Sequence, residues 1–244
     1  MSVEEKLNTL AKKLIAIAKK LITIAENEQK VYEAGKKAEY DAFWDVAWRN
    51  RTNFNSAFCG YGWTDETFKP PENTTKKPGS SDSMFYRCQI TDLEGLLAER
   101  NVVIDTSNSA YIDNFYAQSS VTHVPELSAK KAYSCSGIFN SCTNLVSVRK
   151  LICKEDGSLS FWNAFAGCAN LEYIRFEGKI GKDPALSSCQ KLSHDSLMSV
   201  LGALMDYSAD TSGTSWVCTL GTTNLGKLTD EEKAIATEKG WTLA

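Results

Sequence analysis

Apolar residues near the start of the chain recur with alternating spacings of three and four. They occupy the a and d positions of a heptad repeat, and they are Leu7, Leu10, Leu14, Ile17, Leu21, Ile24 and Val31. Alanines at 11, 18 and 25 widen this stripe. Such a repeat predicts a coiled-coil helix, and leucine at a with isoleucine at d favours more than two strands. We therefore predict an oligomerising helix over residues 1–48 that forms a homotrimer, with a tetramer as the alternative.

A second pattern, Phe-x-x-Cys-x-Asn-Leu-x-x-Val/Ile, occurs twice in the middle of the chain, 26 residues apart, over 139–148 and 165–174. A third copy is predicted 24 residues upstream, with Phe115 aligned to Phe139 and Gln118 where a cysteine is expected. A degenerate fourth copy follows downstream. Each unit is too short to bury its apolar face alone, so the recurrence indicates stacked units that share one core. The predicted core residues are Phe115, Val121, Val124, Phe139, Cys142, Leu145, Val148, Phe165, Cys168, Leu171, Ile174, Cys189 and Leu192.

The segment between the helix and the repeats, residues 49–80, is predicted to be an aromatic joint and a linker. Its aromatic residues include Phe58, Tyr61 and Trp63. We interpret them as a cap on the first repeat, with a carbohydrate-stacking patch as the alternative. The prolines, glycine and serines that follow are typical of an exposed loop. A helix is predicted over 93–100 and a strand over 102–104.

The end of the chain, residues 193–244, departs from the repeat pattern. Ser193-x-x-Ser196 and the apolar residues after it predict an amphipathic helix. A strand is predicted over 216–220, and a capping box that begins at Thr229 opens a last helix that stops at Gly240. Atypical terminal units cover the open ends of stacked repeats, so we predict a helix-strand cap.

The charge pattern limits the possible partners. The net charge of -3, without a basic block, argues against a nucleic-acid partner. The longest apolar runs of the first helix have five residues, so neither a signal peptide nor membrane insertion is predicted. A helix lying on a membrane surface is the alternative, but eight lysines balance eight carboxylates over residues 1–48, which favours a solvated oligomer.

The residues that carry chemistry in other proteins form no recognisable set here. The eight cysteines contain no Cys-x-x-Cys pair and are accompanied by two histidines. We interpret Cys142, Cys168 and Cys189 as buried packing thiols rather than disulfides or a metal site. His194 lies at a helix start, where capping is the simpler role, and no carboxylate spacing singles out a catalytic pair. We predict no catalytic residues, no metal and no cofactor.

The repeat unit resembles the leucine-rich repeats of the BspA kind found in bacterial surface proteins. In addition, the blocks 26–44, 57–65 and 227–241 are similar to leucine-rich-repeat proteins of phages and prophages of gut Firmicutes. The resemblance covers nearly the whole chain. It implies a virion accessory protein, either a fibre or a tail-associated adhesin, and it supplies no catalytic residues.

The expected fold class is therefore α+β, with an N-terminal coiled-coil helix, an irregular leucine-rich-repeat solenoid and a C-terminal cap. The expected boundaries are 1–48 for the oligomerising helix, 49–80 for the joint, 81–192 for the solenoid and 193–244 for the cap. The number of stacked units is left open by the irregular spacing between them.

The expected function is host-surface binding by a phage virion protein. The helix would attach to other virion proteins, and the solenoid head would bind a host glycan or protein. The candidate ligand contacts are Tyr111, Tyr116, Tyr133, Phe161 and Trp162, because aromatics on a rigid scaffold make good contacts. The alternative is a structural virion decoration, or a bacterial surface protein, without receptor binding.

Overall fold

The computed structural model describes residues 3–42, 44, 48, 51–60 and 62–244. The chain divides into two compact units, Met1–Asn50 and Arg51–Ala244. The fold is mixed α+β: an N-terminal helix, and a second unit that contains several small parallel sheets. No helix in the described part of the chain is long and apolar enough to cross a membrane.

The first unit contains helix α1, Val3–Ala42. Leucine, alanine, lysine and glutamate dominate this segment, and they favour helix because they lose little side-chain freedom in it. The helix was predicted to continue to Trp48. Beyond Ala42, only Trp44 and Trp48 of that extension are described, and their rings pack edge to face with centroids 5.3 Å apart.

The second unit begins with short elements. They are β1 (Thr75–Lys76), α2 (Leu93–Glu99), β2 (Val103–Ile104) and the 3-10 turn η2 (Thr106–Asn108). Three longer strands follow: β3 (His123–Ser128), β4 (Ser147–Ile152) and β5 (Tyr173–Glu177). The chain ends with α3 (His194–Ala203), β6 (Trp216–Cys218), α4 (Thr222–Leu225), α5 (Asp230–Glu238) and β7 (Trp241–Leu243).

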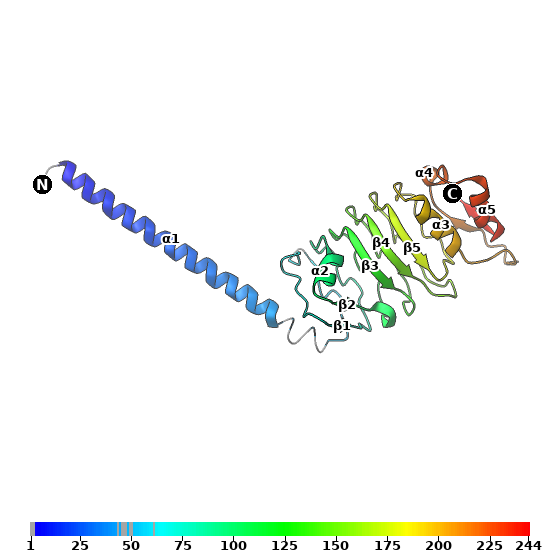
Figure 1. Ribbon diagram of the computed structural model, residues 1–244, viewed down its shortest axis with the longest axis horizontal. Helices are drawn as coiled ribbons and strands as arrows, with labels where there is room; N and C mark the ends of the chain where they lie inside the picture. The colour runs from blue at the N-terminus through cyan, green and yellow to red at the C-terminus, as the bar shows by residue number, and fades with distance from the viewer. Residues whose placement is uncertain (1–2, 43, 45–47, 49–50, 61) are drawn as a thin grey trace. The chain divides into compact units, whose positions relative to one another are not determined.

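The strands form three parallel sheets, in the orders β1-β2, β3-β4-β5 and β6-β7. In the central sheet Val124 pairs with Val148, which pairs with Ile174. These offsets of 24 and 26 residues confirm the strand alignment predicted from the sequence. Figure 1 shows the three strands side by side, with α2 next to β3 and α3 next to β5.

The edge of β5 is covered by side chains of α3. The backbone N–H groups of Ile174 and Phe176 donate to the hydroxyl oxygens of Ser196 and Ser199, over 3.0 and 2.9 Å. A strand edge with unpaired N–H groups would attract another chain, and these two serines occupy them. Helix α3 therefore closes the sheet at this end.

A turn recurs along the second unit, and one copy of it precedes each strand of the central sheet. Each turn holds two residues with positive φ, four positions apart, and the pairs are Ser56/Gly60, Ser83/Arg87, Asn114/Gln118, Gly137/Ser141 and Asn163/Gly167. Neighbouring turns are joined by backbone hydrogen bonds, as from Phe139 N–H to the Ala164 carbonyl over 2.9 Å. Two residues after the first positive φ, each turn buries an aromatic ring: Phe58, Phe85, Tyr116, Phe139 and Phe165.

These five rings form one column, which we call the ring column. Successive centroids are 5.1, 5.5, 5.6 and 5.5 Å apart, and every pair is stacked. Offset stacking at such distances adds to the stabilisation that burial of the rings already gives. The ring column therefore lies at the centre of the core of the second unit.

The ring column corrects the predicted alignment of the third copy. Tyr116, not Phe115, is the counterpart of Phe139. Eight residues separate Tyr116 from Val124 in β3, whereas nine separate Phe139 from Val148 in β4, so aligning the strands shifts the ring by one position. Phe115 is also buried and packs edge to face on Tyr116.

The same shift removes Gln118 from the cysteine position. Gln118 has a positive φ of 56°, and Ser119 takes the place that Cys142 and Cys168 fill in later turns. Ser119 is buried, and its hydroxyl lies 3.7 Å from the Cys142 sulfur. The departure from the repeat is thus a replacement of thiol by hydroxyl.

Residues 51–80 belong to the second unit. Phe54 and Phe58 are fully buried, and the Phe54 N–H donates to the Ser80 carbonyl over 2.7 Å. The stretch predicted to be an exposed loop contributes β1 and the buried Pro70 and Pro78. Tyr61, which was assigned with Phe58 and Trp63 to the predicted cap, lies outside the described residues.

The predicted end elements are confirmed. Ser193 caps α3 by accepting from the Ser196 N–H, and Thr229 forms a capping box with Glu232 at the start of α5. Gly240, with φ of 82°, ends that helix. The strand predicted over 216–220 is shorter, Trp216–Cys218, and pairs with β7.

Candidate binding surface

Three aromatic side chains of the repeated turns face solvent. Tyr111 is 51% exposed, Tyr133 68% and Trp162 73%. Tyr111 and Trp162 each neighbour a fully buried residue in the chain, Ile112 and Phe161. At both places, therefore, one side chain enters the core while its neighbour in the chain points to solvent.

The backbone that carries these rings is fixed. The Tyr133 N–H donates to the Ala110 carbonyl over 3.1 Å, and the Trp162 carbonyl accepts from Gly137 N–H over 2.8 Å. The Tyr111 and Tyr133 rings contact each other, with centroids 5.3 Å apart and planes at 59°. Tyr111 and Tyr133 precede two consecutive turns, and Trp162 belongs to the turn after these two. We call Tyr111, Tyr133 and Trp162 the aromatic edge.

Carboxylates stabilise the same turns. The Asp113 carboxylate accepts from the Ser136 N–H over 2.8 Å and from the Ser134 hydroxyl. Burial, together with the charge of Asp113, raises the pKa of Asp82 above its ordinary value.

A rigid aromatic pair, such as Tyr111 and Tyr133, beside hydrogen-bonding groups suits contact with a sugar face or an apolar side chain.

Two of the predicted ligand contacts are wrong. Tyr116 is 3% exposed because it belongs to the ring column, and Phe161 is buried and contacts Phe176 edge to face. Phe161 follows the same turn geometry as Cys135, since each lies two residues before a positive φ, and both point inward. Neither Tyr116 nor Phe161 is accessible to a macromolecular partner.

The predicted core residues are all buried. They are Phe115, Val121, Val124, Phe139, Cys142, Leu145, Val148, Phe165, Cys168, Leu171, Ile174, Cys189 and Leu192. The thiols form a column beside the rings. Cys142 donates to the Tyr116 carbonyl over 2.9 Å and Cys168 to the Phe139 carbonyl over 3.0 Å. These thiols fill space and satisfy backbone carbonyls.

Burial makes the thiols unreactive. It raises the pKa of Cys142 to about 11 and of Cys189 to about 12, and it also raises the pKa of Cys168. The thiolate is the form that binds metals and reacts with oxidants, so these groups stay protonated at neutral pH. In the described part of the chain, no three His, Cys, Asp or Glu side chains gather as a metal site would need.

The two histidines make structural contacts. His194 Nε2 lies 2.7 Å from the Glu232 carboxylate and so joins α3 to α5. His123 Nδ1 lies 2.8 Å from the Ser147 hydroxyl on the neighbouring strand. Neither arrangement combines a hydroxyl, an imidazole and a carboxylate in one chain of hydrogen bonds among the described residues.

The apolar stripe of α1 is exposed along the helix. Ile17, Leu21 and Val31 expose between 54% and 73% of their surface. Leu14 and Ile24 are exposed as well, while the side chains of Leu7 and Leu10 lie outside the described residues. An apolar stripe of this length normally faces another helix.

A cavity between α2 and β3, which Tyr116 helps to line, was not predicted from the sequence. The sequence holds a signal for it, since Tyr116 is a tyrosine in a column of phenylalanines. The misaligned third copy hid that signal because it placed Phe115 in the column.

Comparison of the chain with known protein families, curated proteins and solved structures found no match.

Proposed function

We propose that this chain is a fibre- or adhesin-type protein of a phage particle. Helix α1 assembles copies of the chain and attaches them to other virion proteins, and residues 51–244 form a leucine-rich-repeat head that binds a host-surface glycan or protein. The single observation that carries the proposal is the exposed apolar stripe of α1.

The exposed apolar stripe of α1 requires a partner surface that buries it. Leu14, Ile17, Leu21 and Ile24 lie exposed along one face of a 40-residue helix. Burying each of these side chains stabilises an assembly by about 1.5 to 3 kcal/mol. A partner helix with the same heptad repeat supplies the matching surface, and leucine at a with isoleucine at d favours three or four helices. Three is the proposed number.

The solenoid assignment of the head is supported by the offsets of 24 and 26 residues in the central sheet and by the ring column. Units of this size that repeat a turn and a strand resemble leucine-rich repeats. The assignment to a phage particle rests on the resemblance of the blocks 26–44, 57–65 and 227–241 to phage and prophage proteins that was noted from the sequence.

The aromatic edge is the proposed contact surface. Its rings are exposed while their backbone is held by hydrogen bonds to neighbouring turns, so binding costs little conformational entropy. Three heads on one stalk convert weak single contacts into strong avidity when receptors lie within their reach.

The test is to incubate the fluorescent full-length protein with a panel of gut Firmicutes strains. Tyr133→Ala combined with Trp162→Ala should abolish labelling, whereas Tyr173→Ala removes an exposed tyrosine from β5 and should leave labelling unchanged. If the double variant still labels the cells, the contact surface is not the aromatic edge. Absence of labelling across the whole panel would favour the purely structural role.

A further inference from the structure

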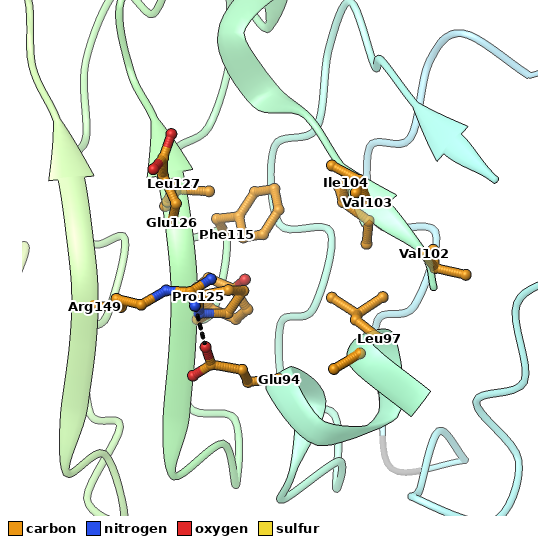
Figure 2. A pocket seen from close by; sticks show the side chains of 12 residues that line it. Glu94, Leu97, Val102, Val103, Ile104, Phe115, Pro125, Glu126, Leu127 and Arg149 are labelled. Carbon is orange, nitrogen blue, oxygen red and sulfur yellow. Dashed lines mark ion pairs between the residues drawn. The ribbon is translucent and has the colours of Figure 1, made fainter. Parts of the chain in front are cut away.

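A cavity of about 210 Å³ lies between α2 and β2 on one side and β3 on the other. Figure 2 shows its walls, which are mostly apolar. The side chains that line it are Glu94, Leu97, Ala98, Val102, Val103, Ile104, Phe115, Tyr116, Pro125, Glu126, Leu127 and Arg149.

The cavity arises from the longest unit of the head. Arg87 and Gln118 occupy equivalent turn positions 31 residues apart, whereas Ser141 and Gly167 are 26 apart. This longer unit contains α2 and β2, and β2 pairs with β1 rather than with β3. Pro125, which has no N–H to donate, lies on the resulting edge of β3. The gap between β3 and α2 is therefore a product of the fold.

The Tyr116 hydroxyl is the unexplained group of this cavity. Tyr116 stands in the ring column, where the other four turns bury phenylalanine. Its hydroxyl makes no hydrogen bond to any described residue. The hydroxyl oxygen is not sealed inside the core, so it opens onto the cavity, where a molecule can reach it. Phenylalanine would stack in the column equally well without bringing a polar group to this apolar wall. A partner from outside the chain accounts for the tyrosine.

The mouth of the cavity is electrically balanced. The Arg149 guanidinium and the Glu94 carboxylate form an ion pair at 3.1 Å, drawn as a dashed line in Figure 2. Burial, and then the neighbouring Cys88, Cys142 and Glu94, raise the pKa of Tyr116, so its hydroxyl stays neutral and keeps a proton to donate. An anion would meet the Glu94 carboxylate. A cation would find the two lining carboxylates, those of Glu94 and Glu126, already paired with Arg149 and Lys150.

We propose that this cavity binds a neutral, mainly apolar small molecule whose hydrogen-bond acceptor takes the proton of the Tyr116 hydroxyl. The volume suits one substituted ring, since an apolar cavity of about 150 Å³ accommodates benzene. The apolar walls bury the ring, and the hydroxyl fixes its orientation, which is the usual division of labour in small-molecule sites. This site is separate in its residues from the aromatic edge.

The experiment measures binding of defined probes to the full-length protein by ligand-observed NMR and calorimetry. Acetophenone and anisole are neutral rings with an acceptor, ethylbenzene lacks the acceptor, and benzoate carries a negative charge. We expect saturable binding of acetophenone or anisole, weaker binding of ethylbenzene, and the weakest binding of benzoate.

Two substitutions separate the ligand from the fold. Tyr116→Phe keeps the ring stack and should weaken binding of the acceptor probe about tenfold without changing that of ethylbenzene. Ala98→Phe adds a ring at an exposed helix position of the cavity wall and should abolish binding of all probes. If neither acetophenone nor anisole binds saturably to the unchanged protein, the cavity holds only water and the proposal is overturned. The proposal is also overturned if the Tyr116→Phe variant binds these two probes as tightly as the unchanged protein does.

Discussion

The rings of Tyr116 and Phe139 stack in a nearly parallel, offset arrangement, with centroids 5.6 Å apart and planes at 6°. They come from neighbouring turns, whose backbones are joined by a hydrogen bond from the Tyr116 N–H to the Ile138 carbonyl over 2.8 Å. Ring stacking and backbone pairing thus fix the same spacing between turns.

The ring column predicts a contrast between two substitutions of Tyr116. Tyr116→Ala removes a buried ring between Phe85 and Phe139 and should destabilise the protein by about 3 to 5 kcal/mol. Tyr116→Phe keeps the ring and removes an unpaired hydroxyl, so it should be neutral or stabilise by about 1 kcal/mol. Chemical denaturation of ligand-free protein measures both, and equal losses for the two variants would contradict the stacking account.

The thiols predict a pattern of chemical labelling. Cys59 is exposed, and the other seven cysteines are buried. A thiol reagent at neutral pH should therefore modify one cysteine quickly and the rest only on unfolding. Mass spectrometry after timed labelling identifies the sites, and rapid labelling of Cys142 or Cys168 would show that the core is open there.

Cys168→Ala gives a separate test of packing. The thiol fills a buried position and donates to the Phe139 carbonyl over 3.0 Å. Its loss should cost about 1 to 2 kcal/mol in the free energy of unfolding. An unchanged free energy in denaturant titrations would indicate that the site collapses without cost.

The raised thiol pKa values predict a loss of stability in alkaline solution. Burial raises the pKa of Cys142 to about 11 and of Cys153 to about 12, against about 8.5 in an unfolded chain. Below about pH 8 the thiols are protonated in both states, and their contribution to stability is complete. As the pH rises through the unfolded value, thiols ionise only in the unfolded chain, so stability falls until the folded pKa is passed.

Unfolding titrations at pH 7.5, 9 and 10 measure this slope. Cys142→Ala should make the slope shallower, because one ionising group is lost. If the variant shows the same slope as the unchanged protein, Cys142 is not protected from ionisation in the folded state.

The edge of β5 predicts a local effect of Ser199. Its hydroxyl accepts from the Phe176 N–H over 2.9 Å. Ser199→Ala leaves that amide without its partner and should destabilise the protein by about 1 to 2 kcal/mol. Hydrogen exchange should speed up at Phe176 more than at Val148, which lies inside the sheet. Uniform acceleration of both amides would point to a global effect instead.

The sequence was sufficient where a local rule operates. The strands β4 and β5 follow two nearly identical copies of one pattern, and α5 begins at a capping box that involves only residues close in the chain. Ser193 marks the start of α3 for the same reason. Such signals are short in range and survive without knowledge of the fold.

The sequence was insufficient where spacing changes between units. Phe58 and Phe85 belong to the ring column, but their distances along the chain to the next ring differ from those of the later copies. The one-residue difference before β3 displaced the alignment onto Phe115. Only the stacked rings reveal the true register.

For the candidate contacts, too, the sequence could not predict which of two neighbouring aromatic residues is exposed. Phe161 and Trp162 are neighbours in sequence and equally aromatic, yet one is buried and the other is exposed. Which of the two points inward depends on the positive φ at Asn163 and on the turn that precedes it. Composition and periodicity carry no information about that choice.

The helix stripe predicts the effect of two acidic substitutions. Leu14→Glu with Leu21→Glu puts carboxylates on the a positions and should separate the assembly into single chains, because charges there are desolvated without partners. Ala16→Glu with Thr23→Glu adds the same charge outside the stripe and should leave the assembly intact. Identical behaviour of the two double variants would show that the stripe is not the interface.

The mass of the full-length protein in solution tests the central claim most directly. Sedimentation equilibrium over a range of concentrations gives it without a shape assumption. We predict three times the chain mass of 26.9 kDa, held by the stripe of α1. A mass of one chain at every concentration would contradict the claim that the helix assembles and displays the heads.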